Sequence, residues 1–246
     1  VPSLCEMKEP EKIGIYSNSM NKLDVLHFNS DSLLYVKTLH FPLWNKQRGI
    51  PKAYTRLIQY NDSLFIGTSF MSKEISVELM NLKTEKVVNS VNFPLKPKEG
   101  EYSRPYECKI ATEMNFIVAA YRYINRLEIY KLSDQKFQLN TIIGDANNQY
   151  DLYRLNKDNE MILHYSDIVC GKNQIYALYR GVKEKELSSA NSKIEVYSYD
   201  GTHLRTFDLG RSIEKILVDE SSMRIYAFDR NEEKDIVFCY AIESNT

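Results

Sequence analysis

A fivefold internal repeat constrains the fold of this chain more than any other feature. Each copy combines a short apolar strand, a polar turn and a second strand of alternating character, and the copies occupy 13–28, 65–80, 117–132, 175–199 and 225–241. The second strands begin at Leu23, Ile75, Leu127, Ile194 and Ile236, so their spacings are 52, 52, 67 and 42 residues. A polar insert at 183–191 accounts for the longest spacing. Self-similarity at such a period is typical of repeat architectures.

Each copy is flanked by one further apolar run on either side, which makes a unit of four short antiparallel strands. This unit is the signature of a β-propeller blade, so we predict an all-β propeller in a single domain over residues 1–246. A β-sandwich is the alternative, but it does not explain repetition of the same strand–turn–strand unit. The predicted blades are approximately 1–42, 53–94, 104–144, 166–210 and 211–246.

The last repeat stops without an outermost strand, and the first repeat offers no spare strand to complete it. Two arrangements explain this pattern. Either five blades close in an unusual way, or the propeller has six blades and its N-terminal part is missing from the sequence.

Composition excludes several classes of protein. The chain has 32 Lys and Arg against 33 Asp and Glu, which argues against a nucleic-acid binder, since such a protein carries a basic excess. The longest apolar run, 116–121, is far short of the roughly 20 residues that span a bilayer. The four cysteines form no CxxC pair and have no histidine at metal-ligand spacing.

The C-terminal third resembles a known family. The matching features are Leu178-Tyr179-x-Gly181, an Ile-x-Val-Tyr strand before Asp200-Gly201, Phe207-Asp208-Leu209, and Val218-Asp219-Glu220 before Ile225-Tyr226-Ala227. They resemble the TolB-like six-bladed propellers, secreted lipoproteins of gut Gram-negative bacteria. The resemblance implies six blades, a lipoprotein leader and a periplasmic or surface location. It implies no particular activity.

Tyrosine and arginine recur at the ends of the repeated strands, where the turns of a propeller gather on one face. Both residue types are enriched at binding hot spots. The 144–167 segment is long enough to form a lid or a wall beside such a face, and long loops on rigid scaffolds often carry function. The same residues have a structural interpretation, because tyrosine is a good strand former. The candidate ligand-binding residues are Tyr121, Arg122, Tyr153, Arg154, His164, Tyr165, Tyr179, Arg180 and Arg230.

Three carboxylates at similar positions of the first strands form a second candidate site. Glu107, Asp167 and Glu214 would converge on a channel mouth, where oxygen ligands could hold Ca²⁺. Sugar-lactone hydrolases on six-bladed propellers use such an arrangement, by analogy of fold alone. The alternative is that these carboxylates are solvated or paired with basic neighbours.

These observations favour a non-enzymatic binding propeller of the bacterial cell envelope. No nucleophile, metallopeptidase or nucleotide-binding motif is present in the sequence. The expected partner is a protein, a peptide or a carbohydrate, and membrane association would require a lipid anchor upstream of Val1. The alternative function is a calcium-dependent hydrolase that uses the three carboxylates.

Overall fold

The computed structural model describes residues 3–17, 19–41, 44–45, 50–51, 54–69, 76–92, 108–144, 161–229 and 236–242. The chain divides into two compact units, one formed by 1–103 with 133–137 and the other by 104–132 with 138–246. The described part is almost entirely strand, with one short 3-10 helix at Glu184–Glu186. The predicted all-β class and its four-stranded antiparallel sheets are confirmed.

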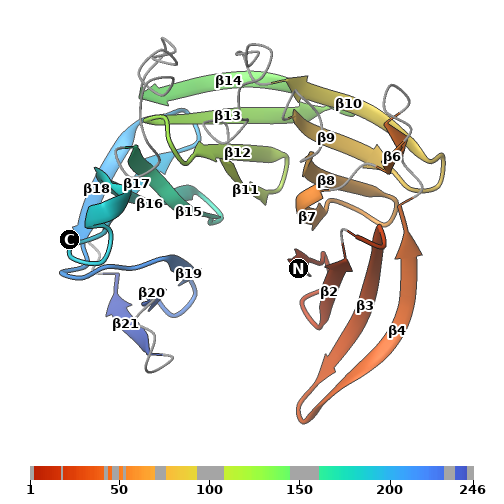
Figure 1. The fold of residues 1–246 in the computed structure, drawn as a ribbon, viewed down its shortest axis with the longest axis horizontal. Coiled ribbons are helices and arrows are strands. Elements are labelled where there is room, and N and C mark those ends of the chain that lie inside the picture. The colour runs from red at the N-terminus through yellow and green to blue at the C-terminus, as the bar shows by residue number, and fades with distance from the viewer. Residues whose placement is uncertain are drawn as a thin grey trace. The chain divides into compact units, whose positions relative to one another are not determined.

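The first unit contains two four-stranded meanders that join through their first strands. Its strands are β1 (Ser3–Glu6), β2 (Lys12–Ser17), β3 (Lys22–Asn29), β4 (Ser32–His40), β7 (Tyr54–Gln59), β8 (Leu64–Ser69), β9 (Ser76–Asn81) and β10 (Lys86–Asn92), with a small pair β5 (Trp44–Asn45) and β6 (Ile50–Pro51). The order β10-β9-β8-β7-β1-β2-β3-β4 is antiparallel except where β1 and β7 run parallel, with Cys5 opposite Leu57 (Figure 1).

The second unit carries three sheets whose strands follow the chain order. They are β11 (Cys108–Glu113), β12 (Phe116–Tyr121), β13 (Arg126–Ser133) and β14 (Lys136–Gly144), then β15 (Ile162–Cys170), β16 (Gln174–Lys183), β17 (Lys193–Ser198) and β18 (His203–Asp208), and finally β19 (Lys215–Asp219), β20 (Arg224–Phe228) and β21 (Val237–Ala241). Each sheet is an antiparallel meander, the topology that the repeat predicts (Figure 1).

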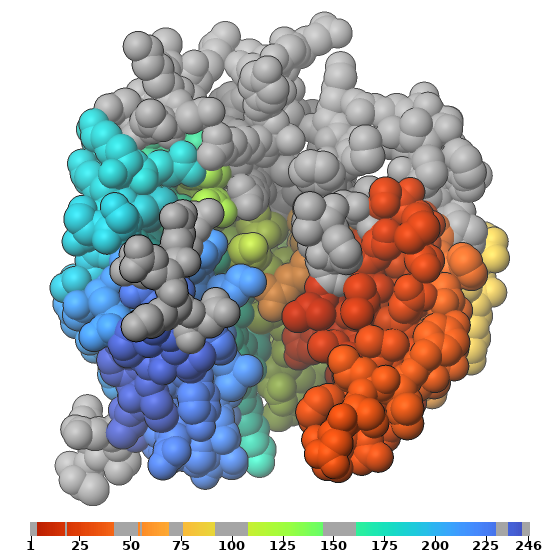
Figure 2. All heavy atoms as spheres, turned by 60° about the horizontal axis from the view of Figure 1, so that its bottom comes forward, coloured from red at the N-terminus to blue at the C-terminus, as the bar shows by residue number. Residues whose placement is uncertain are grey.

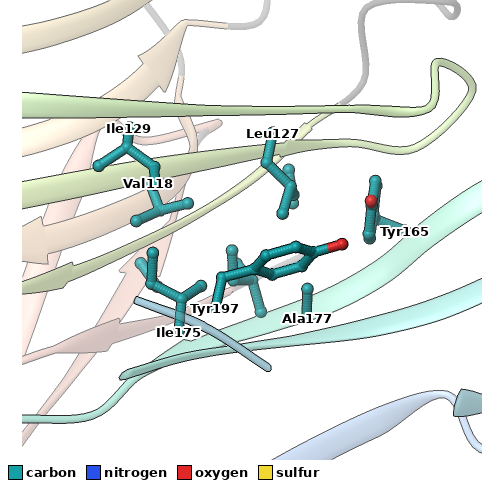
Figure 3. Packing of buried hydrophobic residues seen from close by; sticks show 10 residues of the cluster. Val118, Leu127, Ile129, Tyr165, Ile175, Ala177 and Tyr197 are labelled. Atoms are coloured by element: carbon teal, nitrogen blue, oxygen red, sulfur yellow. The ribbon is translucent and has the colours of Figure 1, made fainter. Parts of the chain in front are cut away.

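Apolar side chains between neighbouring sheets form the cores. In the second unit, Val118 and Ile129 of the β11–β14 sheet face Ile175 and Ala177 of the next sheet, and all four are buried (Figure 3). A second cluster joins the sheet β15–β18 to the sheet β19–β21. The first unit has its own cluster around Tyr16, Phe41 and Phe65, whose rings meet edge to face. No helix among the described residues is long and apolar enough to cross a membrane.

The strand register corrects the repeat alignment at two positions, Ile75 and Ile236. In the last copy Val237, not Ile236, pairs with Phe228 and starts the strand. Ile75, which the sequence places at the start of a second repeated strand, lies outside the described residues, and β9 starts at Ser76. Val77 of β9 pairs with Thr68, as Leu127 of β13 pairs with Ala120. Val77 is therefore the counterpart of Leu127.

Gly144 provides a test of how tightly the β14 end packs. Its φ is +85°, and an added Cβ would lie 2.1 Å from the backbone oxygen of Asn125, which cannot move aside. We expect Gly144→Ala to lower the free energy of unfolding by about 3 kcal/mol, from left-handed strain and overpacking together. Urea denaturation monitored by circular dichroism measures this loss.

Gly210 is the matched control, because its φ is +65° and nothing lies within 4 Å of its added Cβ. Gly210→Ala should cost only about 1 kcal/mol, from backbone strain alone. Equal losses for the two variants would contradict the close approach of Asn125 to Gly144.

Candidate functional site

An acidic residue recurs at one position of the third strand in four of the meanders, two of which belong to the eight-stranded sheet. In each meander it pairs with the fourth residue of the second strand, and the residues on either side of it are buried and apolar. The pairs are Asp24 with Ile15, Glu78 with Gly67, Glu128 with Ala119 and Glu195 with Ala177. The shared motif is Leu23-Asp24-Val25, Val77-Glu78-Leu79, Leu127-Glu128-Ile129 and Ile194-Glu195-Val196.

Glu128 is the most deeply buried of these acids, at 1% exposure. Its Oε2 accepts hydrogen bonds from the hydroxyls of Tyr121 at 2.8 Å and Tyr130 at 2.5 Å. Its Oε1 accepts one from Nε of Arg126 at 2.8 Å, and Nη2 of the same guanidinium lies at 2.6 Å. A buried carboxylate requires such donors, because losing water without them is costly.

Tyrosine hydroxyls also donate hydrogen bonds to Glu78 and Glu195. Tyr54 in β7 donates to Glu78 at 2.9 Å, across the sheet from the first strand to the third. Glu195 accepts from Tyr197 at 2.8 Å and from Tyr165, in the first strand β15, at 3.3 Å. The acids therefore tie strands of one sheet together near the same end.

The tyrosines keep their protons in these contacts. Burial, and then the charge of Glu128, raises the pKa of Tyr121 well above its usual range. The pKa values of Tyr54 and Tyr165 rise for the same two reasons, burial first and then Glu78 or Glu195 respectively. Each hydroxyl thus stays protonated, and can donate a hydrogen bond, throughout the pH range in which the protein is folded.

Two pairs of polar side chains in the second unit are linked by a backbone hydrogen bond from His164 to Arg122. The pairs are His164 with Tyr179 and Arg122 with Glu184, and the four residues are here called the Arg122 cluster. The rings of His164 and Tyr179 lie 6.0 Å apart, and Nη2 of Arg122 lies 4.0 Å from Oε1 of Glu184. The side chains of Arg122 and Glu184 are 25% and 15% exposed, and the other two residues are half-buried. The cluster therefore presents a cation, two rings and a carboxylate that are held in place yet reach solvent.

The pairing of β15 with β16 is irregular at His164. Leu163 lies opposite Val182 and Tyr165 opposite Tyr179, so β16 carries the extra residue of a bulge and His164 lies opposite that bulge. The backbone N–H of His164 donates instead to the carbonyl oxygen of Arg122, at 2.7 Å. Bulges re-aim side chains and are common beside functional sites. The hydrogen bond from His164 to Arg122 links the end of β12 to the start of β15.

The 3-10 turn places Glu184, and Arg180 fixes that turn. The guanidinium of Arg180 donates to the carbonyl oxygens of Leu187 and Ala190 in the insert and to that of Ile213, the last at 2.7 Å. Glu184 in turn accepts a hydrogen bond from the hydroxyl of Tyr123, at 2.5 Å. The polar insert is thereby attached to both neighbouring sheets of this unit.

The predicted binding residues fall into three groups. Arg122, His164 and Tyr179 come together in the Arg122 cluster. Tyr121 and Tyr165 are 1% exposed and Arg180 8%, so the side chains of these three are buried instead of lying at the surface. Tyr165 packs edge to face under Tyr179, with ring centroids 5.3 Å apart. Tyr153, Arg154, Arg230 and most of the 144–167 segment lie outside the described residues.

The calcium site stays a prediction. Oδ2 of Asp167 accepts the backbone N–H of Ile216 at 3.1 Å, and Glu214 is half-buried in the segment before β19. Glu107 lies outside the described residues. Within the described ranges, no group of three or more His, Cys, Asp or Glu residues is arranged to hold a metal ion.

Sequence reasoning missed two parts of this site. Glu184 sits in an insert that has no strand periodicity, so nothing in the sequence connects it to Tyr123. The buried acids did leave a signal, an acid between two apolar residues at the same place in four repeats. Charged residues are rarely fully buried unless paired, which is why alternating strands of this kind suggest a solvent-facing acid.

The chain matches the family described as TolB-like 6-blade propeller-like over residues 5–221. Comparison with curated proteins found no match.

Solved structures confirm the propeller architecture. The WD40 domain of Toxoplasma gondii coronin is 9% identical with a TM-score of 0.56, over 97% of this chain and 54% of that one. BamB from Moraxella catarrhalis is 8% identical with a TM-score of 0.50, over 98% and 59%. A member of the DUF4221 family from Bacteroides vulgatus is 11% identical with a TM-score of 0.58, over 94% and 74%. The chain thus spans a little over half the length of the first two, and such low identities support the fold alone.

The buried Glu128 network provides a stability prediction. Glu128→Ala leaves the guanidinium of Arg126 and two tyrosine hydroxyls buried without their acceptor. Breaking a buried ion pair in this way should lower the free energy of unfolding by about 3–5 kcal/mol, as measured by urea denaturation.

The matched control is Glu186→Ala, at an exposed position of the 3-10 turn, which should change stability by no more than about 0.5 kcal/mol. If Glu128→Ala lowers the free energy of unfolding by less than about 1 kcal/mol, this network contributes little to the stability of the fold.

Proposed function

The chain belongs to the TolB-like 6-blade propeller-like family, and on that premise we propose that it is a non-enzymatic interaction propeller that binds a protein or peptide through the Arg122 cluster. One observation carries this proposal. Two sheets of the second unit bring a partly exposed arginine, an imidazole and a phenol ring close together, and contacts with neighbouring residues hold them there.

The chemistry of the cluster suits a peptide surface. Tyrosine and arginine are over-represented among residues that dominate binding energy. Tyr179 is held by the ring of Tyr165, so little conformational entropy is lost when a partner packs on it. Arg122 can offer its guanidinium to a partner carboxylate or backbone carbonyl, while Glu184 keeps it oriented. The proposed ligand therefore combines an apolar side chain with a neighbouring acceptor oxygen.

A cell-envelope location is part of the same proposal. Its support is the resemblance of the C-terminal strands to secreted TolB-like propellers. The carbohydrate alternative remains consistent with the aromatic ring and the arginine, and the binding experiment below separates it from a peptide ligand.

The test uses the full chain as immobilised bait against an extract of its source cells. Proteins retained by the wild type are identified by mass spectrometry, and the affinity of each purified partner is then measured by biolayer interferometry. We expect Arg122→Glu and Tyr179→Ala each to weaken binding at least about tenfold, because each removes a central contact.

Lys131→Glu is the control, since it makes the same charge change on an exposed residue at the other end of the same sheet. It should leave the affinity within about twofold. A partner that binds the Arg122→Glu variant as tightly as the wild type would refute the proposed surface. Retention of glycans alone, or stoichiometric Ca²⁺ with hydrolytic turnover, would refute the proposed function.

A further inference from the structure

Gly181 lies in the bulge of β16, beside the Arg122 cluster. Arg180 and Gly181 of β16 together lie opposite His164 of β15, two residues against one. The φ angle of Gly181 is +65°, in the left-handed region that residues with a β-carbon rarely adopt. A bulge bends its strand and re-aims the neighbouring side chains. Gly181 therefore lies where β16 departs from regular pairing, just before the turn that carries Glu184.

The ring of Tyr179 folds back over this glycine. A β-carbon built on Gly181 would lie 2.6 Å from Cε1 of Tyr179, 2.8 Å from its hydroxyl oxygen and 2.9 Å from its Cζ. All three atoms belong to the hydroxyl end of the ring, and real β-carbons essentially never come so close to another heavy atom. The ring of Tyr179 therefore occupies the space that a side chain at position 181 would need.

Two further rings contact Tyr179. The ring of Tyr165 meets it edge to face with centroids 5.3 Å apart, and the imidazole of His164 lies 6.0 Å away. Tyr165 is 1% exposed, and a packed interior leaves such a side chain little room to move. A side chain at position 181 would therefore displace the half-buried ring of Tyr179 towards solvent and away from these neighbours.

The left-handed backbone alone does not account for this contact. Gly210 has the same φ of +65°, yet nothing lies within 4 Å of a β-carbon built on it. The end of β16 and the insert that follows, coloured cyan in Figure 2, reach the surface of the second unit, and Gly181 itself is exposed. An exposed glycine fills no core, so its missing side chain matters through the ring that lies against it.

We propose that Gly181 is a positioning residue of the candidate site. By lacking a side chain, it lets Tyr179 lie folded back along β16 beside His164, in the orientation that a partner contacts. This inference rests on the proposed function for its consequence in binding, but not for the position of the ring. It also gives the Leu178-Tyr179-x-Gly181 motif a physical meaning, because the tyrosine ring and the bare backbone two residues later form one unit.

Hydroxyl-radical footprinting, read by mass spectrometry of peptides, tests the position of the ring without any partner. Gly181→Asn is the main variant, because asparagine tolerates a left-handed φ and still adds a β-carbon. We expect hydroxyl radicals to oxidise Tyr179 at least about threefold faster in this variant, since overpacking displaces the side chain. Tyr35, which is 64% exposed, is the internal reference for radical dose.

Gly210→Asn is the matched control, because it adds the same side chain at the same φ with open space around it. It should leave the oxidation rate of Tyr179 unchanged. The role of Gly181 is overturned if Gly181→Asn leaves that rate unchanged, or if both glycine variants raise it equally.

Biolayer interferometry on the partners purified from the extract measures the consequence for binding. Gly181→Asn should weaken binding about tenfold, as Tyr179→Ala does, and should add no more than about twofold to the loss in the double variant. Fully additive losses would overturn the proposal, because Gly181 would then act independently of Tyr179. A displaced ring with unchanged affinity would instead refute the Arg122 cluster as the binding surface, so the two failures are distinguishable.

Discussion

The buried carboxylate in the third strand is the constraint on which the rest of this structure depends. A carboxylate cannot be buried between two apolar side chains unless donors surround it, since the lost hydration is expensive. Here tyrosine hydroxyls supply most of these donors, and Arg126 adds a charged one at Glu128. Each network joins two strands of one sheet, so the need of the carboxylate for donors favours one register of those strands.

These networks explain where the functional candidates lie. Tyr165 donates to Glu195 with its hydroxyl and supports Tyr179 with its ring, so one side chain connects the buried layer to the surface. Arg180 also positions a residue of the cluster, because its hydrogen bonds hold the polar insert that carries Glu184. The Arg122 cluster is thus assembled from residues whose positions are fixed by interactions beneath them. A preorganised surface of this kind loses little entropy on binding.

The sequence predicted the fold well, because strand repetition depends on local alternation and turn chemistry that neighbouring residues determine. It placed Ile75 at the start of a strand, whereas the register makes Val77 the counterpart of Leu127, so the acid at Glu78 was the better marker. Among the candidate residues, Arg122 and Tyr179 were predicted from the strand ends and His164 from the 144–167 segment. The burial of Tyr121 and Arg180 could not be foreseen, because it depends on Glu128 and on carbonyl groups brought near by the fold.

The most direct test of this account is amide hydrogen exchange, followed by mass spectrometry, on a Glu195→Ala variant. Without its acceptor, the hydroxyls of Tyr165 and Tyr197 lose a partner, and the local opening free energy of the surrounding strands should fall. We expect faster exchange over 162–179, where the cluster residues His164 and Tyr179 lie, and unchanged exchange in β20. Unchanged exchange over 162–179 would contradict the claim that buried Tyr–Glu networks hold the surface in place.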